Sequence, residues 1–476
     1  MANENVLSER YATVPINEIF SPEGKTIGER ALWIAVMEAQ AELGVPIPLV
    51  DIKRFKKAKK IVDLDLTRTL EKKLRHDVKA KIQAFIQIAG AGEYIHRAMT
   101  SRDLTDNVEQ MQIRQAARII FGKYVSILRH LIERAEEYKH IILTARTHHQ
   151  GAQTTLLGRR FSMWTEELLY HLIAFEFFIK NYPLRGIKGP VGTQFDMLTL
   201  LGSQEKVERL ENIVAKKLGF KKMLHSTGQV YPRSLDYALL SQLALLSSAC
   251  GSFAVTMRLM AGYDLVTEGF KEGQVGSTAM PYKMNTRSSE RICGFTEVLK
   301  TYADGASRIS GNQWEEGDVF CSVPRRVFIE NAFYTSDGLC ETALTVLNEM
   351  GAYPVIISKE VDRFLPFLAT TEILTLATQS GIGREAAHAI IKKYSVAEAL
   401  KMRKTGSPEN NLAESLSTDP VFAEKGITAE IIAGILSDKK HFIGNAYEQI
   451  ESVVLDARGF IRRYEREAQY EPQEIL

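Results

Sequence analysis

The sequence has few cysteines and no apolar run approaching the roughly 20 residues that would span a bilayer. The cysteines, Cys250, Cys293, Cys321 and Cys340, are too widely spaced for a disulfide framework, and no CxxC pair suggests a zinc site. The amino terminus lacks the basic start and apolar stretch of a signal peptide. These absences predict a soluble protein of the reducing cytoplasm.

An excess of charge of either sign is also lacking. The 60 lysines and arginines nearly balance the 58 aspartates and glutamates, so no whole-molecule field would gather nucleic acid or an acidic membrane. The basic run KRFKKAKK at 53–60 is interpreted as a solvated helix face. An anionic substrate must therefore be held by local cations, and neither nucleic acid nor a membrane is an expected partner.

Proline is absent between Pro48 and Pro183, a stretch rich in helix-forming residues. Between Glu109 and His140 the apolar residues recur three or four apart, which places them on one helical face. Similar segments run from Leu235 to Lys271, from Ser288 to Val323 and from Arg326 to Tyr353. Strand-like alternation is scarce, so the tract RTHHQGAQTT at 146–155 is also expected to be helical. The sequence predicts an all-α protein around an elongated helical bundle.

With 476 residues, the chain is expected to form two or three domains. We expect a mostly helical amino-terminal domain over 1–105 and a central long-helix bundle over 106–355. After Pro354, shorter segments broken by proline and glycine predict a small helical carboxy-terminal domain over 356–476.

The segment 272–290, EGQVGSTAMPYKMNTRSSE, combines glycines, small hydroxyls, a lysine, an amide and a carboxylate between two predicted helices. Backbone amides and Lys283 could gather an oxyanion there, and Gly273 and Gly276 permit backbone motion. The alternative is a surface loop followed by a helix N-cap among Ser288 and Ser289.

Residues 276–290 resemble the pattern GSSAMPYKRNPxRSE of the adenylosuccinate lyase family, within the fumarase and aspartase superfamily. Further matching pieces follow in the family's order: SERYA at 8–12, RHD at 75–77, IHRAMTSRDLTDN at 95–107, RTHHQGAQTT at 146–155, KGPVGTQ at 188–194 and TGQVYPR at 227–233. The resemblance implies three mostly helical domains around a central bundle that forms a homotetramer. It also implies active sites shared between subunits and a purine nucleotide substrate, with no metal or organic cofactor.

The reaction implied by the resemblance is a β-elimination that releases fumarate from adenylosuccinate, giving AMP, and from SAICAR, giving AICAR. The family's base matches Ser277, whose hydroxyl needs nearby cations and amides to favour its alkoxide. The family's general acid matches His148, with Glu290 as its orienting carboxylate. Lys283 would stabilise negative charge, and His76 matches a further active-site histidine.

The resemblance also assigns substrate contacts. Short hydroxyls for the succinyl carboxylates match Thr100, Ser101 and Thr147, and an early ArgTyr pair for the phosphate matches Arg10 and Tyr11. A serine and an arginine that also serve the phosphate match Ser322 and Arg326. The remaining matches are His96, Thr193, Gln229, Asn285 and Arg291.

The chain departs from the family pattern at several positions, of which Gly317 is the most consequential because an arginine is expected there. Such an arginine contact to phosphate is commonly worth about 1.5 to 3 kcal/mol. Arg325 or Lys188 could compensate for it. Two alternatives therefore stay open: a sister lyase that releases fumarate from a different succinylated amine, and a non-catalytic structural protein on the same scaffold. The smaller changes, Thr278, Met284 and Thr286, affect the loop itself.

Overall fold

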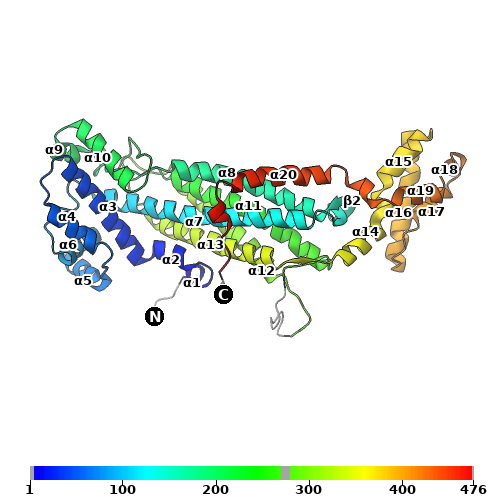
Figure 1. Cartoon of the computed structure of the whole chain (residues 1–476), viewed down its shortest axis with the longest axis horizontal. Coiled ribbons are helices and arrows are strands. Elements are labelled where there is room, and N and C mark those ends of the chain that lie inside the picture. The colour runs from blue at the N-terminus through cyan, green and yellow to red at the C-terminus, as the bar shows by residue number, and fades with distance from the viewer. Residues whose placement is uncertain (1–4, 270–278, 474–476) are drawn as a thin grey trace.

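The chain forms an elongated, almost entirely helical molecule, with a long bundle between two smaller helical ends (Figure 1). This computed structural model describes residues 5–269 and 279–473. The prediction of an all-α protein is confirmed.

Long helices run along the axis of the bundle and form its core. They are α7 (Ser101–Glu137), α8 (Leu157–Asn181), α11 (Ser234–Gly262), α12 (Arg287–Ile309), α13 (Ser322–Glu349) and α20 (Ala446–Ile461). The predicted apolar face of 109–140 is confirmed in α7, where Ile113, Ile120 and Leu128 are fully or almost fully buried. This face packs against α8 and α13, while α12 packs against α11 and α13.

The helix α11 is long and apolar enough to cross a membrane by length and composition. It instead lies within the bundle against α8, α12 and α13, with Leu239, Leu243 and Leu246 buried. A core helix of a bundle needs the same apolar composition.

The amino-terminal end contains short helices that pack around one longer helix. They are α1 (Val6–Arg10), α2 (Val14–Phe20), α3 (Pro22–Glu42), α4 (Leu49–Ala58), α5 (Leu64–Leu74) and α6 (Asp77–Ala89), joined by α9 (Phe195–Leu201) and α10 (Gln204–Lys217). In α4 the basic residues are exposed while Ile52 and Phe55 are buried, which is the predicted solvated face. The expected domain boundary at residue 105 falls inside α7, and α3 packs directly on α7.

Residues 146–155 do not form a helix, so that prediction is wrong. They belong to an antiparallel hairpin of β1 (Ile142–Thr147) and β2 (Gln150–Leu156) at the end of the bundle. Each strand contains two threonines, and β-branched residues favour extended backbone. A second antiparallel pair of strands, each two residues long, consists of β3 (Val266–Thr267) and β4 (Gly351–Ala352).

The carboxy-terminal end has a separate small core. The helices of this end are α14 (Pro354–Leu368), α15 (Thr370–Gln379), α16 (Arg384–Thr405), α17 (Leu412–Ser417), α18 (Pro420–Glu424), α19 (Ala429–Leu436) and the 3-10 helix η1 (Lys439–Ile443). After η1 the chain returns to the bundle, where α20 packs against α7 and α8, and α21 (Glu465–Ala468) packs against α7. The expected domain 356–476 thus contributes to two different cores.

Candidate active site

The predicted site residues fall into three regions of one chain. One region surrounds the amino terminus of α7 and a second is the turn of the β1–β2 hairpin (Figure 1). A third lies where Tyr11, directly after α1, packs on α12. Ser277, the predicted base, lies outside the described residues. The 37 residues of α7 separate the first region from the second by about 55 Å along the helix axis. One chain therefore does not bring Ser101 and His148 together.

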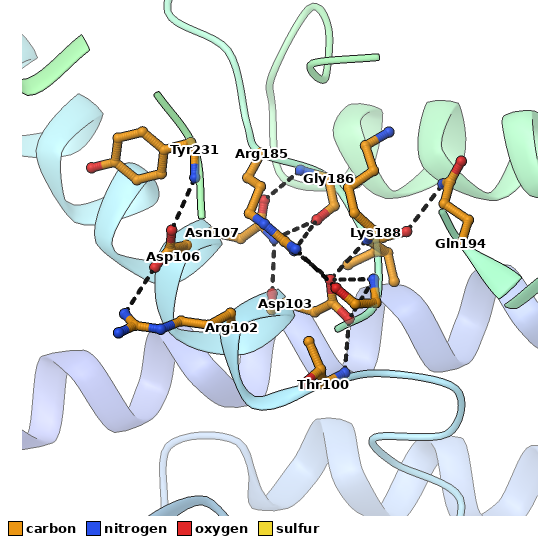
Figure 2. Close-up of polar contacts among 12 residues, drawn as sticks. Thr100, Arg102, Asp103, Asp106, Asn107, Arg185, Gly186, Lys188, Gln194 and Tyr231 are labelled. Carbon is orange, nitrogen blue, oxygen red and sulfur yellow. Dashed lines mark hydrogen bonds and ion pairs between the residues drawn. The ribbon is translucent and has the colours of Figure 1, made fainter. Parts of the chain in front are cut away.

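At the first region, the carboxylate of Asp103 connects Thr100 to the glycine-rich loop 186–194 (Figure 2). It accepts hydrogen bonds from the backbone N–H groups of Thr100 at 2.8 Å, Lys188 at 2.8 Å and Gly189 at 3.1 Å. Asp103 also forms an ion pair with Arg185, and both side chains are fully buried. This pair fixes the position of Thr100 and Ser101 relative to the loop that carries Thr193.

Arg185 extends the same network to a third predicted segment. Its guanidinium donates to the carbonyl oxygens of Gly189 at 3.1 Å and of Gly228 at 2.9 Å. The next residue in that segment, Gln229, donates its backbone N–H to the carbonyl of Glu316 at 2.5 Å. Three segments with predicted substrate contacts are therefore joined by one buried ion pair.

A second buried carboxylate, Asp106, lies one turn further along α7. It accepts from the backbone N–H of Tyr231 at 3.2 Å and from the guanidiniums of Arg102 at 3.2 Å and Arg233 at 3.1 Å. Arg102 also donates to the hydroxyl of Ser322, at 2.9 Å, in the first turn of α13. The structure thus brings Thr100, Ser101 and Ser322 to the same end of the bundle.

The backbone at Gly317 explains why this position lacks a side chain. Its φ of +145° is a conformation that residues with a Cβ rarely adopt, and a Cβ there would lie 3.1 Å from the Cβ of Gln229. An arginine at 317 would need a different local backbone. The Arg326 side chain, on α13, is exposed.

The two cations expected to compensate for Gly317 are both occupied by internal carboxylates. Arg325 donates to Asp236 at 2.6 Å and to Glu109 at 2.8 Å, and Lys188 forms an ion pair with Glu211 at 2.7 Å. Arg325 and Lys188 are at most 4% exposed. Neither presents a free charge to a ligand in this arrangement.

His96 and His76, the predicted site histidines of the first region, differ in their surroundings. The Nδ1 of His96 accepts a hydrogen bond from the indole Nε1 of Trp33 at 3.0 Å, and burial lowers the pKa of His96 to about 4. The His96 ring is therefore neutral near pH 7 and carries its proton on Nε2, from which it can donate. His76 is exposed and caps α6, where its Nδ1 accepts from the backbone N–H of Lys79 at 3.3 Å.

At the second region, His148 and His149 form the two-residue turn of the hairpin. Thr147 pairs with Gln150, and the two histidines have φ angles of +52° and +62°. Positive φ at both central residues matches a type I′ turn, and for residues other than glycine such backbone strain is concentrated at functional sites. The Thr147, His148 and His149 side chains are exposed.

A cavity of about 340 Å³ lies beside this turn, lined by His148 and His149 together with Arg146 and Arg160. A larger cavity, of about 1430 Å³, is lined by residues of the hairpin, α14 and α16, His149 among them. The general acid proposed from the sequence thus borders open space in which a ligand can bind.

At the third region, Tyr11 lies against the first turns of α12. Its ring meets that of Phe295 edge to face at 5.0 Å, and the Arg291 guanidinium lies 5.6 Å from the Tyr11 ring centroid. Arg10 is exposed at the end of α1. Glu290 is exposed on α12 and lies on a different element from His148.

Of the predicted catalytic-loop residues that the structure describes, Lys283 is exposed and Asn285 is partly buried. The helix that follows is capped by Glu268, whose carboxylate accepts from the N–H groups of Ser288 and Ser289, each at 2.9 Å. The alternative of an N-cap among these serines is wrong, because the N-cap residue is Thr286 and both serines lie in the first turn of α12. Glu268 lies about 20 residues away, and only the fold brings it to the start of α12.

Comparison with known proteins first defines the class. A family model described as Lyase matches residues 22–298. The 3-carboxy-cis,cis-muconate lactonizing enzyme of Pseudomonas putida has the same fold, with a TM-score of 0.82, 18% identity and coverage of 96% of this chain and 100% of its own. A fumarate lyase from Mesorhizobium sp. BNC1 gives a TM-score of 0.79 at 18% identity, covering 94% and 98% of the two chains. The protein is thus a lyase of the fumarase and aspartase superfamily.

Sequence relatives then define the family. A model described as Adenylosuccinate lyase C-terminus matches residues 366–453. The adenylosuccinate lyase of Saccharomyces cerevisiae is 34% identical over 94% of this chain and 93% of its own length. That of Methanocaldococcus jannaschii is 28% identical over 94% of both chains. This chain belongs to the adenylosuccinate lyase family.

Proposed function

We propose that the protein releases fumarate from adenylosuccinate, giving AMP, and from SAICAR, giving AICAR. The observation that carries this proposal is identity with adenylosuccinate lyases along nearly the whole chain, together with retention of the loop and ThrHis residues. Without the loop residues a β-elimination would lack its base, and without the ThrHis residues it would lack its acid.

In the proposed mechanism, Ser277 removes the proton beside a succinyl carboxylate, and Lys283 with Asn285 stabilises the dianionic aci-carboxylate that forms. The C–N bond then breaks while His148 protonates the leaving nitrogen, with Glu290 as its charge partner. An exposed turn position for His148 supports this role, because the ring must reach the substrate.

We further propose that these groups meet in a homotetramer with active sites shared between subunits. The separation of about 55 Å along α7 supports this, because a single chain cannot combine its own regions. Apolar side chains on one exposed face of α8 also favour association, namely Met163, Tyr170, Ile173 and Phe177. We place the assembly in the cytoplasm, and the substrate is a small molecule.

Fumarate release from both nucleotides, followed by its ultraviolet absorbance, tests the proposed activity. We expect turnover of both substrates, and Ser277→Ala and His148→Ala should each lower kcat by several orders of magnitude. If neither nucleotide gives product at saturating concentration, the proposal is refuted.

Gly317 favours one alternative, a sister lyase with a different amine leaving group. Argininosuccinate and aspartate are therefore assayed in parallel. Fumarate from one of these, with none from the nucleotides, would establish the alternative.

A further inference from the structure

The proposed nucleotide substrate carries a 5′-phosphate, and the position where its family provides an arginine is Gly317 in this chain. The backbone of Gly317 disfavours any side chain, and Arg325 and Lys188 are already neutralised inside the protein. A replacement for the missing arginine must therefore come from another element. We propose that Arg102, in the first turn of α7, replaces the missing arginine and binds the phosphate. This inference rests on the proposed function.

The position of Arg102 is defined by contacts at both ends of its guanidinium. One nitrogen donates to the hydroxyl of Ser322 at 2.9 Å and the other to the carboxylate of Asp106 at 3.2 Å. The Arg102 side chain is 18% exposed, so it is held in place while one edge still faces solvent. Ser322 and Arg326 lie four residues apart at the start of α13, and Arg102 contacts Ser322, one of the two residues of this helix assigned to the phosphate.

Within the described part of the chain, the Arg102 guanidinium has only a shared carboxylate partner. Asp106 also pairs with Arg233, within a cluster that Arg325, Asp236 and Glu109 complete to three guanidiniums and three carboxylates. A phosphate carries a charge of about −1.5 to −2 near pH 7 and has several strong acceptor oxygens. It would complete the neutralisation of Arg102 without displacing Asp106.

The backbone adds to this preference. Ser322 begins the 28-residue helix α13, whose first N–H groups and positive dipole end favour negative charge. A guanidinium, a serine hydroxyl and a helix amino terminus together form an arrangement suited to a phosphate.

The competing interpretation is that Arg102 has only a structural role, in which it holds α7 against α13 through Ser322. Loss of a structural contact would lower kcat/KM equally for substrates with and without phosphate, whereas loss of a phosphate ligand would lower it only for the phosphorylated substrate. The two interpretations are separated by comparing each nucleotide with its dephosphorylated nucleoside.

The test measures kcat/KM for adenylosuccinate and for its 5′-dephosphorylated nucleoside in the wild type and in Arg102→Met. We expect the variant to lose about ten- to a hundredfold with the nucleotide, the usual worth of a charge-assisted hydrogen bond, and no more than about twofold with the nucleoside. Arg102→Lys should recover part of the loss. Equal losses with both substrates, or no loss with either, would overturn the assignment.

A binding measurement decides the same question without turnover. Calorimetric titration with AMP and with adenosine should show tighter binding of AMP to the wild type, a preference that Arg102→Met removes. The matched control is Arg118→Met, an exposed arginine on the same helix, which should keep the preference. If the wild type binds AMP and adenosine equally, Arg102 is not a phosphate ligand. If Arg102→Met keeps the preference, the assignment is also overturned. If the wild type prefers AMP, Arg102→Met removes that preference and the wild type releases no fumarate, the proposed activity fails while the assignment of Arg102 stands.

Discussion

Replacing Asp103 by asparagine should destabilise the protein severely and weaken substrate binding. The substitution keeps the shape of the side chain and removes its charge. In the wild type, the carboxylate accepts from Arg185 and from the N–H groups of Thr100, Lys188 and Gly189. An amide has one acceptor oxygen and an NH₂ group, so at least one of these donors would face another donor.

The magnitude follows from the burial of the ion pair. Asp103 and Arg185 are fully buried, and Arg185 forms no other ion pair within the described ranges 5–269 and 279–473. Leaving such a cation unpaired costs about 3–5 kcal/mol. Since Asp103 also holds the start of α7, we expect a higher KM because Thr100 and Ser101 lose their fixed position.

Asp337→Asn is the matched control, because Asp337 is equally buried and forms an ion pair with Lys123 in the middle of the bundle. Lys123 keeps a second partner, Glu341, at 2.6 Å. The control should therefore lose less stability than Asp103→Asn, with little change in KM. Urea unfolding at one fixed protein concentration measures the first quantity and fumarate kinetics the second. Equal losses in the two variants, or a loss below about 1 kcal/mol for Asp103→Asn, would refute the reasoning.

Three further outcomes are expected. Mixing inactive Ser277→Ala and His148→Ala proteins should restore activity through hybrid sites, and no recovery despite demonstrated subunit exchange would argue against shared sites. The unfolded chain protonates His96 near pH 6.5 while the folded chain resists this until about pH 4. Stability should therefore fall as pH drops through this window, and His96→Gln should flatten the fall in urea midpoints measured at pH 7 and pH 5. Glu268→Gln should lower the free energy of unfolding by about 0.5–2 kcal/mol in the same assay, through a weakened cap of α12, and an unchanged midpoint would contradict that role.

The helical fold was predictable because its signals are local. The proline-free stretch and the periodic apolar residues before His140 predict α7. The hairpin was not predictable in the same way, since its turn is formed by His148 and His149 without the glycine or asparagine that usually marks a type I′ turn. The returning helix α20 carries no local sign that it joins the bundle rather than the small carboxy-terminal core.

For the site, ordered motifs predicted which segments matter, and the roles assigned to them stay predictions. The motifs did not predict the connections between them. Asp103 and Arg185 are 82 residues apart, and neither has a neighbour in sequence that indicates a pair. Likewise, the loss of an arginine at Gly317 is visible in the sequence, while the positive φ that accompanies it is a property of the folded backbone.

The return of α20 and α21 to the bundle makes the small carboxy-terminal unit an insertion between two bundle segments rather than an appended tail. It is connected to the bundle at both of its ends, by α14 on one side and by the chain leading into α20 on the other. A truncation after residue 436 would therefore remove two helices that pack on α7. An internal deletion that rejoins the chain across the insertion would instead leave the bundle sequence complete, and is the better way to remove this unit.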